Sequence, residues 1–166
     1  MKNLLLLFSL VLLIGSCTSQ NKPKTIFIVR HAEKQLVQDP DPELLQVGQI
    51  RAQKLAQIVA NKEIKHVFST DYKRTRLTVQ PAATQAGVSI QSYDPRNQDT
   101  LVEQIRSLEG NILVVGHSNT VSQLANYFVG NDEKFQDLAE SDYDFIYEVT
   151  LEKNGSSVMR KLYKDY

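Results

Sequence analysis

The sequence has no excess of either charge and almost no cysteine. Nineteen Lys and Arg side chains are balanced by nineteen Asp and Glu side chains. A basic face that binds nucleic acid is therefore not expected, and affinity for anions must come from a few locally placed cations. Cys17 is the only cysteine, which excludes an intramolecular disulfide. Repeats and low-complexity segments are also missing, so the 166 residues favour a single domain.

One long apolar run occurs, at residues 4–14, after Lys2. A transmembrane helix needs roughly 20 apolar residues, so this shorter run fits a cleaved signal over residues 1–16. The segment Ile14-Gly15-Ser16-Cys17 resembles the lipobox of bacterial lipoproteins, which implies lipidation of Cys17. Residues 17–24 would then form a lipidated tether. The mature protein would be extracytoplasmic, anchored to a bacterial membrane on the periplasmic side or at the cell surface. A plain secretory signal with an incidental cysteine is the alternative.

Residues 25–166 alternate between strand-like and helix-like patterns. Short apolar runs predict strands at 25–29, 66–69, 88–93 and 111–115. Helical periodicity follows each of them, at 44–59, 72–86, 100–108 with Thr100 as N-cap, and 121–128. Asn154-Gly155 lies between two further strand-like segments and predicts a hairpin. We therefore expect an α/β three-layer sandwich, with a mostly parallel sheet flanked by helices and an antiparallel C-terminal hairpin.

Three polar motifs follow directly after predicted strands: Arg30-His31-Ala32-Glu33-Lys34, Ser69-Thr70-Asp71-Tyr72-Lys73-Arg74-Thr75 and Gly116-His117-Ser118-Asn119-Thr120. Ligands bind beyond the carboxyl ends of the strands in such sheets, so the motifs should meet in one crevice. Arginine neutralises phosphate oxygens in planar, bidentate fashion, and a neutral imidazole is an effective nucleophile. The sequence thus predicts that Arg30, Arg74 and His117 hold a phosphoryl group while His31 attacks phosphorus.

In this order, the three motifs resemble the histidine phosphatase (phosphoglycerate-mutase-like) superfamily. The resemblance implies that Arg30 and Arg74 bind phosphate, that His31 is phosphorylated, and that His117 and Asn119 contact the phosphate. The short chain looks most like the small phosphatase branch. One departure is Leu45, which stands where relatives commonly carry Thr or Ser.

The proton donor for the leaving group has no obvious motif. Asp94, just past a predicted strand, is the first candidate, and Glu33 is the second. The resulting hypothesis is a metal-independent phosphatase without a cofactor. It would act on a phosphate monoester or a phosphohistidine, carried by a small molecule or a phosphoprotein. Two alternatives stay open, namely a non-catalytic module that binds phosphorylated ligands and, less favoured, an isomerase that moves phosphate between hydroxyl groups. The sequence specifies no oligomeric state.

Overall fold

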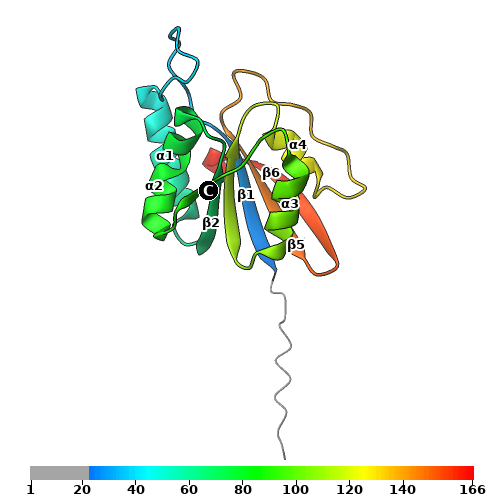
Figure 1. Ribbon diagram of the computed structural model, residues 1–166. Coiled ribbons are helices and arrows are strands. Elements are labelled where there is room, and N and C mark those ends of the chain that lie inside the picture. Colours follow the sequence, from blue (N-terminus) through cyan, green and yellow to red (C-terminus); the bar gives the residue numbers. More distant parts are fainter. Residues whose placement is uncertain (1–22) are drawn as a thin grey trace, which may run out of the picture.

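A computed structural model describes residues 23–166 of the chain as one mixed six-stranded sheet covered by helices (Figure 1). The expected signal and Cys17 lie outside the described residues. The strands are β1 (Lys24–Arg30), β2 (Ile64–Ser69), β3 (Ile90–Ser92), β4 (Asn111–Gly116), β5 (Phe145–Glu152) and β6 (Gly155–Leu162). Their order across the sheet is β3-β2-β4-β1-β5-β6.

The four strands from β3 to β1 run parallel, whereas β5 and β6 are antiparallel. Ile112 to Val115 of β4 are buried on both faces of the sheet, as expected for a central parallel strand. The β5–β6 hairpin turns at Asn154, so the predicted C-terminal hairpin is confirmed. Among the described residues, no helix has the length and apolar character that crossing a membrane requires.

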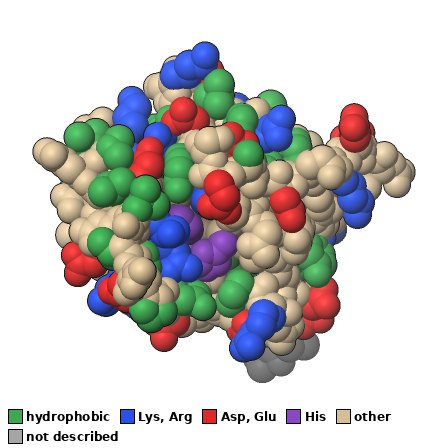
Figure 2. Space-filling model, turned by 90° about the horizontal axis from the view of Figure 1, so that it is seen from above, with side chains coloured by type: hydrophobic (Ala, Val, Ile, Leu, Met, Phe, Trp, Pro, Cys, Tyr) green, Lys and Arg blue, Asp and Glu red, His purple; other side chains and the backbone are tan. Residues whose placement is uncertain are grey.

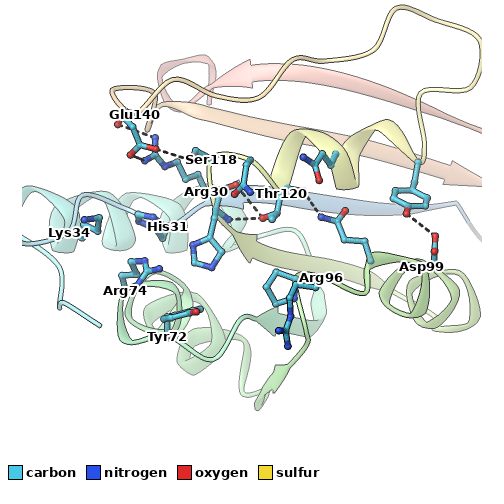
Figure 3. Close-up of a pocket in the computed structure, with 16 residues that line it drawn as sticks. Arg30, His31, Lys34, Tyr72, Arg74, Arg96, Asp99, Ser118, Thr120 and Glu140 are labelled. Atoms are coloured by element: carbon cyan, nitrogen blue, oxygen red, sulfur yellow. Dashed lines mark hydrogen bonds and ion pairs between the residues drawn. The ribbon is translucent and has the colours of Figure 1, made fainter. Parts of the chain in front are cut away.

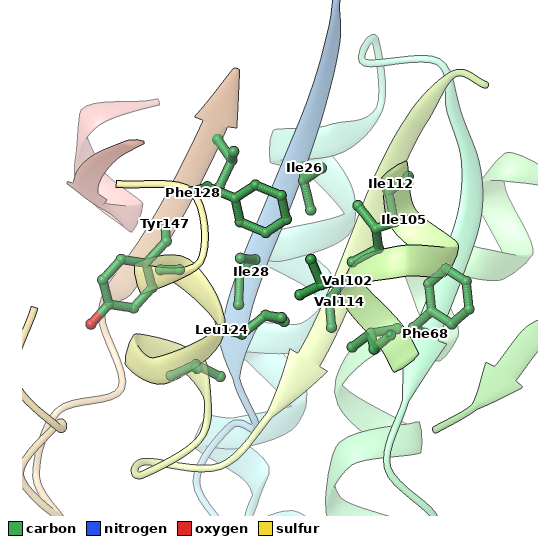
Figure 4. Packing of buried hydrophobic residues seen from close by; sticks show 14 of the residues in the cluster. Ile26, Ile28, Phe68, Val102, Ile105, Ile112, Val114, Leu124, Phe128 and Tyr147 are labelled. Atoms are coloured by element: carbon green, nitrogen blue, oxygen red, sulfur yellow. The ribbon is translucent and has the colours of Figure 1, made fainter. Parts of the chain in front are cut away.

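Helices cover both faces of the sheet, which confirms the three-layer architecture. They are α1 (Gln46–Val59), α2 (Lys73–Ala86), α3 (Gln98–Ser107) and α4 (Val121–Asn126), with a 3₁₀ turn, η1, at Tyr163–Asp165. Alternate β1 residues point to opposite layers. Phe27 packs with α1 and α2, whereas Ile28 packs with α3 and α4 in the cluster shown in Figure 4.

The predicted start of α3 is wrong by three residues. Thr100 is not the N-cap, because Asn97 takes that position and its side-chain oxygen accepts a hydrogen bond from the Thr100 amide (3.4 Å). Asn is among the best N-capping residues, so Asn97 is well suited to begin the helix. Strand β3 is also shorter than the predicted 88–93.

Helix α1 begins against the loop that follows β1. Leu45 is its N-cap and supplies no side-chain hydrogen bond, but the Leu45 amide donates to the Glu33 carbonyl (2.9 Å). Gly48 lies one turn further on, where a Cβ would approach the same carbonyl oxygen to 2.3 Å. The sequence thus lets α1 pack closely on the loop that carries His31.

Candidate active site

A cleft of about 700 Å³ opens where β1, β2 and β4 end. Figure 2 looks down on this end and shows histidine side chains beside Lys and Arg side chains near the middle of the face. The cleft is lined by all three predicted motifs and by α3 (Figure 3). Its lining residues are Arg30, His31, Lys34, Tyr72, Arg74, Pro95, Arg96, Gln98, Asp99, His117, Ser118, Asn119, Thr120, Gln123, Tyr127 and Glu140.

His31 is buried directly after β1, and only 4% of its surface is exposed. Its amide donates to the Gly116 carbonyl (2.9 Å), and its Nδ1 lies 2.8 Å from the Ala32 carbonyl oxygen. A carbonyl can only accept, so Nδ1 carries the hydrogen and Nε2 of the neutral ring carries a lone pair. Burial, together with the nearby Arg30 charge, lowers the His31 pKa to about 3. The ring is therefore neutral at physiological pH, and its Nε2 lone pair is chemically able to act as a nucleophile.

Two arginines flank this imidazole. The Arg30 Nη1 donates to three backbone carbonyls of residues 139–142, and its Nη2 donates to the Glu140 carboxylate (2.8 Å). Arg74, in the first turn of α2, stacks on the Tyr72 ring at 4.3 Å. The Nε atoms of both arginines are buried and have no hydrogen-bond partner within residues 23–166. Buried, unpaired donors of this kind fit an anionic ligand that would satisfy them.

His117 faces His31 across the cleft, with 5.5 Å between the ring centroids. Its Nε2 lies 3.0 Å from the Thr70 hydroxyl, which lies 3.0 Å from the Thr75 hydroxyl. Thr75 in turn donates to the Thr70 carbonyl (2.9 Å). Because each hydroxyl has one hydrogen, Thr70 donates to Thr75 and accepts from His117 Nε2. Burial, followed by the charges of Arg74 and Arg30, lowers the His117 pKa to about 4.

Asn119 is exposed on the cleft wall. The structure therefore brings together His31 and all four residues predicted to bind phosphate. The two predicted proton donors are placed elsewhere. Asp94 does not line the cleft; it pairs with Arg96 at 3.0 Å, and the hydrogen bonds from Arg96 lower its pKa.

Glu33 also lies outside the cleft lining and accepts a bidentate pair of hydrogen bonds from Arg51 (2.6 and 2.9 Å). Burial raises the Glu33 pKa, but the hydrogen bonds and charge of Arg51 outweigh burial and lower it. Arg51 also contacts Asp144, so Glu33 ties the loop after β1 to the segment before β5. The geometry supports a structural role for Glu33. Within residues 23–166, no group of three or more His, Cys, Asp or Glu side chains is arranged to hold a metal.

Several site residues were missed by the sequence analysis. Tyr143 belongs to none of the predicted motifs, but its ring centroid lies 4.2 Å from the Arg30 guanidinium and 6.2 Å from the centroid of the His31 ring. Glu140 contacts Arg30 from a segment without regular secondary structure. Such a contact spans 110 positions in the chain and has no local sequence signal. Tyr72 lies within the predicted motif at residues 69–75, and this position was the one available sequence signal for its place in the cleft.

Comparison with known families agrees with this geometry. Residues 26–95 match the histidine phosphatase superfamily (branch 1). The matched segment runs from β1 through β3 and contains Arg30, His31 and Arg74. No curated protein sequence matches the chain.

Solved structures extend the histidine phosphatase likeness to the whole fold. The protein histidine phosphatase SixA, solved with tungstate, matches with a TM-score of 0.69 at 16% identity, over 85% of this chain and 98% of its own. Phosphoglycerate mutase from Bacillus anthracis has a TM-score of 0.67 at 12% identity, over 86% and 94%. A mycobacterial glucosyl-3-phosphoglycerate phosphatase has a TM-score of 0.63 at 9% identity, over 85% and 98%. The described residues therefore have the histidine phosphatase fold.

Proposed function

We propose that the protein is a member of the histidine phosphatase superfamily that hydrolyses phosphate monoesters or phosphohistidine through a phosphohistidine on His31. One observation carries the proposal. The Ala32 carbonyl holds the hydrogen of the His31 imidazole on Nδ1, which leaves the Nε2 lone pair available beside two arginines, the buried Arg30 and the partly buried Arg74, whose Nε atoms are both buried. A histidine that served only packing would not need two guanidinium groups with unpaired Nε atoms beside it.

The reaction has two displacements at phosphorus. In the first, His31 Nε2 forms a bond to phosphorus, the bond to the leaving group breaks, and the leaving group takes up a proton. In the second, water attacks phosphorus, the bond to Nε2 breaks, and the imidazole returns to its neutral state. Arg30 and Arg74 neutralise the phosphoryl oxygens throughout, and His117 is held in position by the hydroxyl of Thr70.

The charge on the phosphoryl group is met by side chains of the protein, so we propose that the reaction needs no metal ion. Turnover should then be unchanged by EDTA. The open cleft admits a small phosphorylated molecule or a phosphorylated side chain of a protein. Several structural neighbours are phosphatases, which supports a phosphorylated substrate for this protein.

The test is phosphate release from p-nitrophenyl phosphate by the full-length protein in detergent. His31→Ala should abolish turnover and the acid-labile phosphoenzyme. The matched control is His66→Ala, since His66 lies on β2, does not line the cleft, and its ring is within hydrogen-bond distance of the Glu109 carbonyl (3.1 Å) rather than of any cleft residue in the described structure. Turnover that survives in His31→Ala would overturn the mechanism. If the wild-type protein binds phosphate but releases none from any substrate, the binding module is the better hypothesis.

We further propose that residues 1–16 form a lipoprotein signal and that Cys17 carries the lipid. Strand β1 begins at Lys24, at the end of the sheet opposite the cleft, because the cleft is built at the carboxyl ends of the parallel strands. An anchor attached ahead of β1 would therefore leave the cleft facing away from the membrane. A phosphorylated substrate outside the cytoplasm could then reach His31 without passing the anchor.

A further inference from the structure

The proton donor is the part of the reaction that the predicted motifs leave unassigned. Among the described residues that line the cleft, two carry a carboxyl group, Asp99 and Glu140. Asp99 lies in the first turn of α3 and accepts a hydrogen bond from the Tyr127 hydroxyl (2.7 Å). Glu140 instead contacts Arg30, the arginine adjacent to His31. It is therefore the carboxyl group beside the phosphoryl-binding end of the cleft.

The Glu140 side chain bridges two of the three motifs. One carboxylate oxygen lies 2.8 Å from Arg30 Nη2 and the other lies 3.1 Å from the Ser118 hydroxyl (Figure 3). The backbone of this segment is fixed, because Arg30 Nη1 donates to the carbonyls of Ala139, Glu140 and Asp142. The side chain itself is 82% exposed. A fixed backbone with an exposed side chain lets the carboxyl group change partner without a change of fold.

We propose that Glu140 donates the proton to the leaving group when His31 is phosphorylated. This role rests on the proposed function and adds a catalytic residue to it. In the free protein the Arg30 guanidinium binds the Glu140 carboxylate. A phosphoryl dianion competes for the same guanidinium, so substrate binding releases the carboxylate towards the mouth of the cleft, where the leaving group must exit.

The same exchange changes the proton affinity of Glu140. Its pKa is held below the usual range by the Arg30 charge and then by the Ser118 hydrogen bond. The other titratable group that acts on it is His31, and Ser118 itself stays neutral. A bound dianion cancels the Arg30 charge and places negative charge nearby, which favours the protonated carboxyl group. That group gives its proton to the leaving oxygen, and the resulting carboxylate takes a proton from the water that attacks phosphohistidine.

The test compares three probes that differ in their need for protonation: p-nitrophenyl, phenyl and glycerol phosphate. In Glu140→Gln, kcat with glycerol phosphate should fall about 100-fold, as expected for loss of a general acid, with a smaller loss for phenyl phosphate. With p-nitrophenyl phosphate, whose leaving group is stable without a proton, kcat should change less than about threefold. Glu140→Asp should restore part of the loss. Glu133→Gln is the matched control, because Glu133 is exposed before the same segment and does not line the cleft.

Three outcomes would count against this role. Equal losses with all three probes would make Glu140 a substrate-binding residue only. A rise in kcat/KM with all probes would show that Glu140 merely competes with phosphate for Arg30. Unchanged kinetics would remove it from the reaction. Phosphohistidine on His31 is also measured after Glu140→Gln has been mixed with p-nitrophenyl phosphate. Its detection would show that the proposed function holds even if the role of Glu140 fails. Its absence from the wild-type protein would overturn both proposals.

Discussion

At the scale of single residues, two features of the fold act on different properties of His31. The Ala32 carbonyl selects the ring nitrogen that carries the hydrogen, and burial keeps the ring neutral. Residue type alone specifies neither property. The Arg30-His31 pair can be recognised in the sequence. The tautomer of the His31 ring, however, follows from a backbone carbonyl whose direction depends on the turn after β1. Glu33 lies two residues after His31 and carries a carboxyl group, as many proton donors do, but this carboxylate forms an ion pair with Arg51.

The lowered histidine pKa values predict an acid-sensitive fold. The His31 pKa is about 3 in the folded protein against 6.5 for an unperturbed histidine, so below pH 6.5 the unfolded chain binds a proton that the folded protein does not. Stability should therefore be full above pH 6.5 and decline as pH falls, by at most about 1.4 kcal/mol per pH unit for this histidine. His117, with a pKa of about 4, acts in the same direction.

Urea unfolding at pH 7.5, 6.0 and 5.0 measures this effect, in a range where unperturbed carboxylates remain mostly ionised. His31→Gln should reduce the dependence of the unfolding free energy on pH relative to the wild-type protein. An equally steep dependence in His31→Gln would mean that other groups cause it.

At the scale of elements, helix α1 positions the loop that carries His31. Gly48 lies where a Cβ would come within 2.3 Å of the Glu33 carbonyl oxygen, and that oxygen also accepts the Leu45 amide. The close approach of helix to loop fixes the path of residues 31–33. Leu45, which lacks a capping side chain, contributes only its backbone to this contact.

Gly48→Ala should destabilise the protein, although alanine is the better helix former by about 1 kcal/mol. Overpacking against a backbone atom costs about 1–3 kcal/mol, and the displaced loop should also lower kcat with p-nitrophenyl phosphate. Gln53→Ala, at an exposed position of α1, is the control for helix propensity. Urea midpoints and kcat are measured together, and a stabilised, fully active Gly48→Ala protein would contradict the packing argument.

At the scale of the whole molecule, the parallel arrangement of β1, β2 and β4 gathers three motifs at one end of the sheet. The chain enters β1 at the other end. This polarity is what makes a membrane anchor compatible with an accessible cleft.

Lipidation is tested by mass spectrometry and by partitioning of the full-length protein expressed in a bacterium that processes lipoproteins. The wild-type protein should lose residues 1–16, gain the mass of acyl chains at Cys17 and partition into detergent. Cys17→Ser should stay unmodified, and its kcat should equal that of the wild-type protein because the cleft lies at the far end of the sheet. Cleavage without acylation of the wild-type protein would favour the plain secretory signal.

The sequence by itself determined the element order, the hairpin and five of the residues that line the cleft, because these depend on local periodicity and on motifs at strand ends. Even so, the start of α3 was misplaced, since Asn97 and Thr100 are both good caps and only the packed helix distinguishes them. Only the tertiary structure decided the partners of the carboxylates. Glu33 and Asp94 pair with arginines away from the cleft, while Glu140 meets Arg30 across 110 positions of the chain. Such pairings depend on which side chains the folded backbone brings within a few ångströms, and local sequence carries no record of that distance.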